Sequence, residues 1–497
     1  MLSINKLKLV IIFSIIIPTL AFSLPMEWHG VFAVDHHSLQ NYRGVEENNT
    51  PTDSLWGETQ EPLPAPGNQK NATFQSYIIK LRPTLTINDS ASFFAELTTG
   101  YGRGGFFGEK PVQNYPQTFG NALYHINMAN FDNPINLNQF YMELYSDTAI
   151  YQIGRSPDHF GMGLVLNDGH NTWDRFASTR DQLKINFKIG NFSINPFVGK
   201  IGTGGSLTTA THAYEYGIPV FYEVAETDLT FGVIWINRSL AEGFDGYRFN
   251  LDKPIDDASP TSWKTVGKSN VNFIDIYLKK IWGKFKLEIE IPFFTGEMGN
   301  LYKPGEMAKY RAMAGVVNLA YTINDYWKVG LDGGFVSGDD GSEDAFNAMF
   351  LNPNYNIAFI LFHYNASAIS SVKNPGYPFD AYITDTTFFR LYGEFVTGRW
   401  NMNLTAIYAF ANNPAKAADP QSYNPQKNKL FNAKYDQDKG LGFELDYGLT
   451  YSWNDEINIG LDLAYLMAGD YWAFNNTDTP NTLRAPWLFK FKASMDF

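Results

Sequence analysis

Short turns and long polar loops alternate along this 497-residue chain, and this alternation constrains the fold more than any single motif. Eight short turns are expected near residues 88–90, 147–148, 190–191, 226–228, 283–284, 324–325, 398–399 and 454–455. Nine long loops lie between them, near residues 35–71, 102–136, 157–180, 202–215, 239–270, 297–308, 338–380, 412–439 and 470–485. Because each connection joins two strands, about 18 antiparallel strands are predicted, or alternatively about 16, with all short turns at one end.

Between these connections, polar and apolar residues alternate. The stretches DQLKINFKIG (181–190), KFKLEIEI (284–291) and GFELDYGLTY (442–451) each place aliphatic or aromatic residues on one face and charged or amide residues on the other. Four prolines, Pro83, Pro196, Pro219 and Pro292, fall inside predicted strands. Each proline removes a ladder hydrogen bond, so these positions predict bulges or rim positions unless the strand bounds are shifted.

The N-terminal segment has the pattern of a secretory signal. Lys6 and Lys8 precede an apolar run from residue 9 to residue 20, and small residues lead to an expected cleavage after Ser23. An N-terminal membrane anchor is the alternative, but the apolar run is short and Pro18 lies near its end. The signal is therefore assigned to residues 1–23 and the mature chain to residues 24–497.

Composition decides the environment of the strands. Aromatic residues make up 16% of the chain, yet the mean hydropathy is −0.25. No apolar run of about 18 residues, the length of a membrane-spanning helix, follows the signal. An exported chain of this kind fits an all-β, transmembrane antiparallel up-and-down β-barrel in the bacterial outer membrane. Cysteine is absent, which excludes a disulfide scaffold, and the net charge of −13 argues against nucleic acid as a partner.

Tryptophan gives an independent indication. Residues of this type lie beside predicted short turns or near the mature N-terminus, at Trp28, Trp282, Trp327, Trp400 and Trp453. In a barrel all five positions share one membrane interface, where an aromatic girdle belongs. Soluble β-proteins have no comparable reason for this placement.

The last strand alternates up to the final residue. Its predicted outward face consists of Trp487, Phe489, Phe491, Met495 and Phe497. This strand must pair with the first one to close the barrel and remove both sheet edges. It also resembles the C-terminal assembly signal of bacterial outer-membrane proteins, which implies the outer-membrane assembly machinery as a partner. Outer-membrane lipid and lipopolysaccharide are the expected surroundings of the outer face.

Strand parity predicts the residues that line the lumen. The pore-lining residues assigned in this way are Lys80, Arg82, Lys184, Lys188, Glu288, Glu290, Arg390, Glu394, Lys490 and Lys492. The basic residues cluster on the second, sixth and last strands, while acidic residues dominate the two strands before the last. Such a separation would create a transverse field that selects among charged solutes. The alternative is a set of mutually neutralising ion pairs, and the sequence leaves both readings open.

One long loop, 338–380, differs from the others. It begins with acidic residues and continues into an apolar stretch, 357–362, that would be unfavourable in water. We expect this stretch to fold into the barrel mouth as a constriction, with Ile357, Phe359 and Phe362 at its centre; an extra hairpin is the alternative. The acidic residues lack the spacing of an EF-hand, so no metal site is predicted, and no cofactor is expected.

The stretch IGRSPDHFGMGLVLNDGHNTWDRFASTRDQL, residues 153–183, resembles the corresponding part of alginate-export-type and related porin-like barrels. Those proteins carry a Gly-Arg strand end, a glycine loop, and then Trp, Arg and Asp; the segment from Ser337 is also similar to that group. Ser156 departs from the Gln expected after Gly-Arg. The resemblance implies an 18-stranded channel for an anionic polymer or a small solute, with Arg155 and Arg175 near the path.

Catalysis is not predicted. Asp35, His37 and Ser38 offer a base and a nucleophile, but adjacent residues of an extended strand point to opposite faces. The sequence therefore predicts a porin-like channel for passive diffusion of small or anionic solutes. The rival is a plugged barrel that acts as a surface adhesin or receptor through its extracellular loops.

Overall fold

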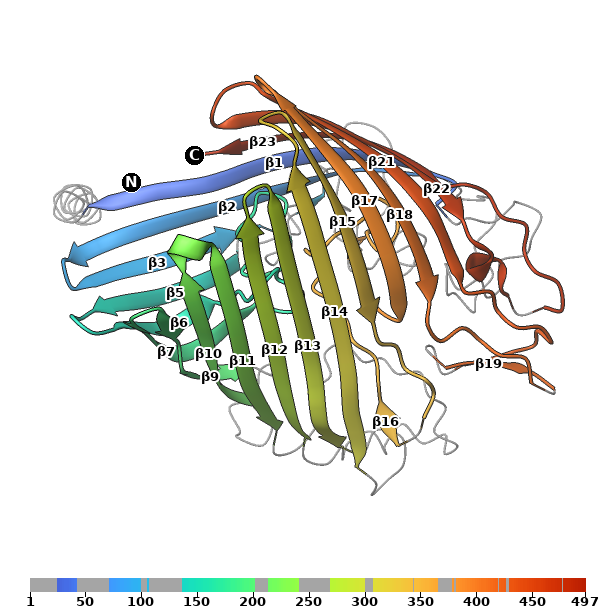
Figure 1. Ribbon diagram of the computed structural model, residues 1–497, viewed down its shortest axis with the longest axis horizontal. Helices are drawn as coiled ribbons and strands as arrows, with labels where there is room; N and C mark the ends of the chain where they lie inside the picture. The colour runs from blue at the N-terminus through green and yellow to red at the C-terminus, as the bar shows by residue number, and fades with distance from the viewer. Residues whose placement is uncertain are drawn as a thin grey trace, which may run out of the picture.

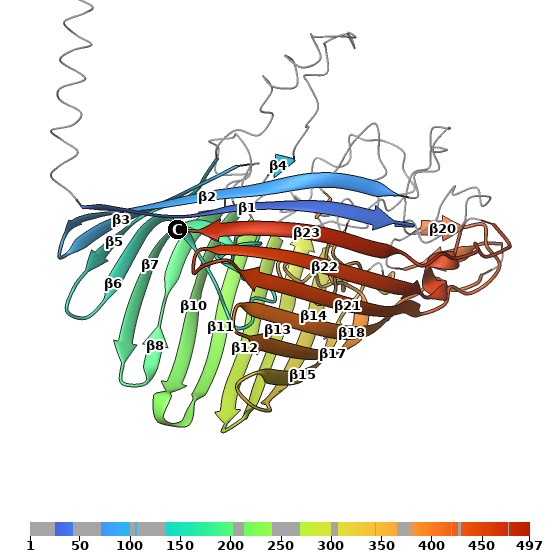
Figure 2. The ribbon, with the colours of Figure 1, turned by 90° about the horizontal axis from the view of Figure 1, so that it is seen from above.

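The computed structural model describes residues 25–42, 71–99, 105–106, 136–201, 213–240, 269–299, 307–342, 344–364, 378–379, 381–418, 420–425, 429–475 and 477–497. The predicted signal, 1–23, lies outside the described residues. The described part forms a closed antiparallel β-barrel (Figures 1 and 2), which confirms the predicted fold class.

The barrel wall consists of 18 strands in the described residues, counting β8 and β9 as two parts of one strand. Their bounds are β1 Met26–Gln40, β2 Ala72–Asn88, β3 Ala91–Thr98, β5 Asn136–Tyr145, β6 Ile150–Pro157, β7 Thr179–Ile189, β8 Phe192–Ile194, β9 Phe197–Ile201, β10 Ala213–Val224, β11 Leu229–Leu240, β12 Ser269–Trp282, β13 Phe285–Gly299, β14 Ala308–Thr322, β15 Trp327–Val336, β17 Thr386–Thr397, β18 Trp400–Ala411, β21 Gly440–Ser452, β22 Ile457–Ala468 and β23 Trp487–Asp496.

Four shorter strands and two 3₁₀ turns complete the secondary structure of the described residues. They are β4 Gly105–Phe106, β16 Ala345–Phe346, β19 Ser422–Asn424, β20 Lys429–Phe431, η3 Ala225–Thr227 and η5 Asp470–Ala473. β4 and β16 belong to the barrel sheet. β16 pairs in parallel with β14, and β19 pairs with β20 as a separate hairpin. The structure describes no helix that is long and apolar enough to cross a membrane.

Each wall strand pairs with its neighbours in the chain, and β1 pairs with both β2 and β23 (Figure 2). At the seam, the N–H of Gly30 donates to the carbonyl of Phe497 at 2.7 Å, and the N–H of Phe497 donates to the carbonyl of Gly30 at 3.0 Å. The final residue therefore completes the ladder. Closure satisfies the backbone groups of both edge strands, as a membrane requires.

All eight predicted short turns join consecutive wall strands at one end of the barrel. The start of β1 and the end of β23 lie at this end, which is the periplasmic end in an outer-membrane barrel. Gly190, Gly283 and Gly398 lie in three of these turns with φ between +56° and +58°, a region that glycine adopts without strain.

The four strand prolines lie where ladders are interrupted. The β2–β3 ladder skips Pro83, and the β13–β14 ladder skips Pro292. Pro196 separates β8 from β9, and opposite this break Asn195 donates its N–H to the carbonyl of Pro219 at 2.9 Å. Each proline thus occupies a position where its missing N–H costs no ladder bond.

The outer surface is apolar and rich in rings. The five turn-side tryptophans are between 41% and 61% exposed, and the predicted outward residues of β23 are between 36% and 48% exposed. Trp327 packs on Phe395 and Trp400 packs on Tyr451, with centroid distances of 4.5 and 4.6 Å, which extends the ring of aromatics along the short-turn end. A closed ladder with this exterior is an outer-membrane barrel.

Candidate functional site

In the described part of the chain, two extracellular connections fold into the lumen. They are the β6–β7 loop, residues 158–178, and the inner part of the β15–β17 connection, residues 344–364, here named the β15–β17 loop. Apolar residues of both loops share a buried cluster with inward-facing wall residues, and this cluster contains Leu164, Met349, Leu351, Ile357, Ile360 and Leu361 beside Ala314, Val316, Ile407 and Leu466. The two loops thus narrow the barrel from within.

A wall carboxylate holds the β6–β7 loop. Glu290 on β13 is fully buried and accepts the backbone N–H groups of Met162 and Leu164, the latter at 3.2 Å. Gly161, with φ +59°, passes so close that a Cβ would collide with this carboxylate. Charge-assisted bonds to backbone N–H groups solvate the buried carboxylate and fix the loop.

Two carboxylates of β21 hold the β15–β17 loop. Glu444 accepts the N–H groups of Ile360 at 2.6 Å and Leu361 at 2.8 Å. Asp446 accepts the N–H of Phe359 at 3.0 Å. The apolar stretch 357–362 therefore lies against the lumen side of the wall.

The structure places the three predicted constriction residues in this stretch. Ile357 is buried, while Phe359 and Phe362 are half-buried and pack against the same cluster. The described residues 347–364 form turns and bends, not the extra hairpin that the sequence left open. Phe362 has φ +64°, a left-handed conformation that is uncommon for an aromatic residue.

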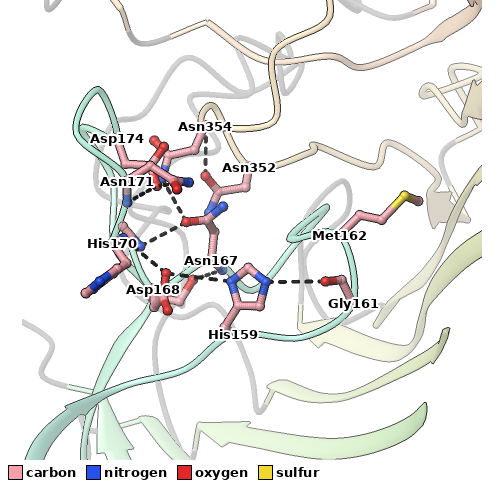
Figure 3. A network of polar contacts seen from close by, with 12 residues as sticks. His159, Gly161, Met162, Asn167, Asp168, His170, Asn171, Asp174, Asn352 and Asn354 are labelled. Carbon is pink, nitrogen blue, oxygen red and sulfur yellow. Dashed lines mark hydrogen bonds and ion pairs between the residues drawn. The ribbon is translucent and has the colours of Figure 1, made fainter. Parts of the chain in front are cut away.

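Asparagines join the two loops (Figure 3). The side-chain carbonyl of Asn354 accepts the N–H groups of Arg175 at 3.1 Å and Phe176 at 3.2 Å. Its amide donates to Asn167 Oδ1 at 3.1 Å and to the carbonyl of Phe176 at 2.6 Å. Asn352 adds a backbone bond of 2.6 Å to the carbonyl of Leu164. The loops therefore form one unit.

Asp35 on β1 anchors both loops. Arg175 of the β6–β7 loop donates to Asp35 at 3.1 Å and to Ser76 at 2.7 Å. His37 Nε2 lies 3.0 Å from Asp35 Oδ2, the oxygen that Arg175 also contacts, and His37 Nδ1 lies 2.8 Å from the hydroxyl of Tyr364 in the β15–β17 loop. Arg175, predicted near the solute path, is buried and holds the loop to the wall. Ser38 faces the opposite side of β1, as the alternation of the strand requires.

Most basic residues of the lumen are paired with carboxylates. Arg82 lies 2.7 Å from Glu96, and Lys184 lies 3.1 Å from Asp158. Lys490 and Lys492, at 3.1 and 2.7 Å, share Asp462. These pairs favour the neutralising arrangement over an unbalanced basic arc.

The other predicted lumen residues have varied surroundings. Arg390 pairs with Asp332, Glu288 with Lys286, and Glu394 with Lys328 at 3.5 Å. Lys80 donates to the carbonyls of Gly169 at 2.8 Å and Asn171 at 2.9 Å, so it holds the β6–β7 loop. Lys188 is exposed beside the short turn between β7 and β8.

Arg155 is placed differently from the prediction. β6 alternates regularly, with Gln152, Gly154 and Ser156 on the inner side, so Arg155 lies on the outer face opposite Asp181 and beside Leu183. Its guanidinium donates to Asp181 at 2.7 and 3.0 Å. The resemblance had placed Arg155 near the solute path, whereas the alternation of the strand turns its side chain outward.

The inward fold of the β6–β7 loop was not predicted. Its sequence signal is present, since Phe160, Leu164 and Leu166 would be exposed in an external loop and are buried here. Gly161 and Gly163, both at positive φ, allow the sharp path. The glycines were interpreted as a family pattern rather than as turns of an inward loop.

At the extracellular rim, Asp385 precedes β17 and joins the β15–β17 and β18–β21 connections. Its carboxylate accepts the backbone N–H and side-chain amide of Asn413 at 3.1 and 2.7 Å. Burial raises the pKa of Asp385 to about 7, against the lowering effect of these bonds. Among the described residues, none of the acidic groups of this rim joins a cluster suited to a metal ion.

A cavity of about 820 Å³ lies between the inner surface of β1–β6 and the β6–β7 loop. It is lined by wall residues His29, Val31, Arg82, Thr84, Phe94, Gln139, Tyr141 and Asp496, and by loop residues Asp168, His170, Asn171, Thr172 and Trp173. The wall residues lie toward the short-turn ends of their strands. The cavity therefore occupies the periplasmic side of the β6–β7 loop.

No family model matches the chain, and no curated protein sequence matches it. Solved structures similar to it include OccK9 (OpdG) of Pseudomonas aeruginosa, with 10% identity over 95% of this chain and 99% of that chain, at a TM-score of 0.49. A BenF-like porin from Pseudomonas fluorescens Pf-5 shows 9% identity over 95% of this chain and 98% of that chain, also at 0.49. OccK2 (OpdF) of Pseudomonas aeruginosa, crystallised with glucuronate, shows 10% identity over 95% and 98%, at 0.46. The barrel architecture of this chain rests on its own strand pairing.

Proposed function

We propose that this barrel is a passive, porin-like channel for small polar solutes across the outer membrane. The observation that supports it best is the polar, ion-paired inner wall together with the 820 Å³ cavity beside the β6–β7 loop. A barrel of about 18 strands encloses more space than wall side chains fill, so the inward loops set what passes.

The ion pairs of the lumen determine how strongly the channel discriminates between anions and cations. Each paired lysine or arginine has an adjacent carboxylate, so its field falls off steeply with distance. A strong preference for anions is therefore not part of the proposal. Size, shape and hydrogen bonding at the two loops decide entry instead.

A plugged barrel that acts as a receptor or adhesin is the second candidate. The buried cluster that joins both loops to the wall favours it, because the cluster occupies part of the cross-section. The two candidates differ in a single property, namely whether a continuous polar path remains beside the loops.

Single-channel conductance of the folded protein in a planar bilayer tests the proposal, with reversal potentials measured in a salt gradient. A steady open conductance with weak charge selectivity is expected. Protein that migrates as a folded, inserted barrel but carries no current, and does not admit small sugars into liposomes, would contradict the channel and favour the receptor.

A further inference from the structure

The cavity beside the β6–β7 loop, here named the niche, has the volume and the lining of a small-molecule binding site. Its volume of about 820 Å³ falls in the range of roughly 300–1,000 Å³ that small-molecule sites occupy. Elements far apart in the chain build it, since β1–β5, the β6–β7 loop and the C-terminal strand all contribute.

Aromatic rings form part of the niche surface. Trp173 packs against a buried apolar cluster of Val31, Ala33 and Ile78 on β1 and β2, which supports the indole ring. On the other wall strands, Phe94 and Tyr141 stack with a centroid distance of 5.1 Å and an interplanar angle of 13°. Both surfaces are therefore held in place by their neighbours rather than free to rotate.

The polar groups of the niche carry no excess positive charge. Arg82 is paired with Glu96 and also donates to the carbonyl of His170 at 3.1 Å. Asp496 accepts the hydroxyl of Thr172 at 3.0 Å, and Asp168 lies 3.7 Å from His159. In the described part of the chain, neither of these two aspartates is paired with lysine or arginine.

We propose that the niche binds a neutral polyhydroxylated solute, such as a sugar, during passage. This inference rests on the proposed channel function and names its solute class. A sugar ring presents C–H groups on its faces and hydroxyls at its edge. The negative face of an indole or phenol attracts the C–H groups. Asp168, Asp496, Gln139 and His170 supply acceptors and donors for the hydroxyls.

Charge sets the order of affinities. An anion of the same size must approach Asp168 and Asp496, and no unpaired cation of the niche compensates that repulsion. Glucose and glucuronate form a matched pair of probes, because both are pyranose sugars of nearly the same size and glucuronate carries a carboxylate at C6. Glucose should bind more tightly than glucuronate.

Isothermal titration of the detergent-solubilised protein with each probe tests this order independently of conduction. For glucose, a dissociation constant of about 1–10 mM is expected for a ligand of about a dozen non-hydrogen atoms. Trp173→Ala should weaken glucose binding about three- to tenfold, and Trp173→Phe less, since a ring face remains. Asp496→Asn should raise the affinity for glucuronate. Trp400→Phe, on the outer surface, is the control and should change neither affinity.

The outcomes separate the two proposals. Glucose binding without conductance would contradict the proposed channel function and leave the proposed sugar site in the niche standing. Conductance without glucose binding at 100-fold the expected constant, or tighter binding of glucuronate than of glucose, would contradict the sugar site in the niche and leave the channel function standing. Unchanged glucose affinity in Trp173→Ala, with Asp496→Asn also unchanged and both variants folded, would place any sugar site elsewhere.

Discussion

Replacing Asn354 by alanine should loosen the two inward loops without weakening the barrel. The substitution removes four hydrogen bonds to the β6–β7 loop, of 3.1, 3.2, 3.1 and 2.6 Å. Each bond stabilises by about 0.5–1.5 kcal/mol net, and in a wet lumen water replaces part of the loss, so about 2–4 kcal/mol is expected in total. That energy raises the population of separated loops about 30- to 1,000-fold.

The assay is the open-channel current at the single-molecule level. Separated loops should appear as added current noise and as sublevels of higher conductance, while the heat-modified gel mobility that reports the folded barrel stays unchanged. Asn356→Ala is the matched control, because the hydrogen bonds of the Asn356 side chain within the described residues go to His363 and Ala358 of its own loop. Identical current traces for both variants and the unaltered protein would refute the idea that Asn354 joins the loops.

Three further predictions follow from single residues. Phe497→Ala should lower the yield of assembled barrel in the outer membrane several-fold, because the aromatic end of the closing strand is lost. Phe489→Ala should have a smaller effect. The heat-modified gel mobility of membrane fractions measures both yields. The pKa of Asp385 is raised to about 7, so its protonated form is favoured in the folded state. The contact between Asp385 and Asn413 at the rim should therefore be firmest below pH 4–5 and weaken as pH rises through 7. Hydrogen exchange of residues 412–415 should show this trend, and Asp385→Asn should abolish it. Asp462→Asn removes the carboxylate that pairs with Lys490 and Lys492 of the last strand. The anion-to-cation permeability ratio, read from reversal potentials, should shift about twofold toward anions, which corresponds to roughly 0.5 kcal/mol of screened charge. An unchanged ratio would mean that solutes do not pass this wall.

The wall of the barrel was predictable because its signals are local. A turn such as Gly283-Lys284 needs only a positive φ and two flanking strands, and the alternation of a strand is set by the two environments that it separates. Closure also followed from sequence, since the outward set on β23 ends at Phe497, whose backbone pairs with Gly30.

The interior was less predictable because it depends on contacts between distant residues. Parity placed Glu290 and Lys80 on the inner side but gave no reason to expect that each binds the backbone of the β6–β7 loop. Arg175 was assigned to the solute path from a resemblance, whereas its position is fixed by Asp35, 140 residues away in the chain. Arg155 was assigned to the path from the same resemblance, whereas the alternation of β6 places it on the outer face beside Asp181. The positions of lumen side chains depend on partners from distant parts of the chain, and the local alternation of a strand does not reveal those partners.

The two joined loops are attached to the wall at well-separated places on the ring: at β1 and β2 through Asp35 and Ser76, at β13 through Glu290, and at β21 through Glu444. These attachments brace the barrel from inside, so that the loops resist both flattening and widening of its cross-section. The cross-section of the barrel is thus set from inside as well as by strand number and tilt. A solute that displaces a loop would then also deform the ring around it, so that lateral pressure in the surrounding membrane and passage through the lumen become mechanically linked.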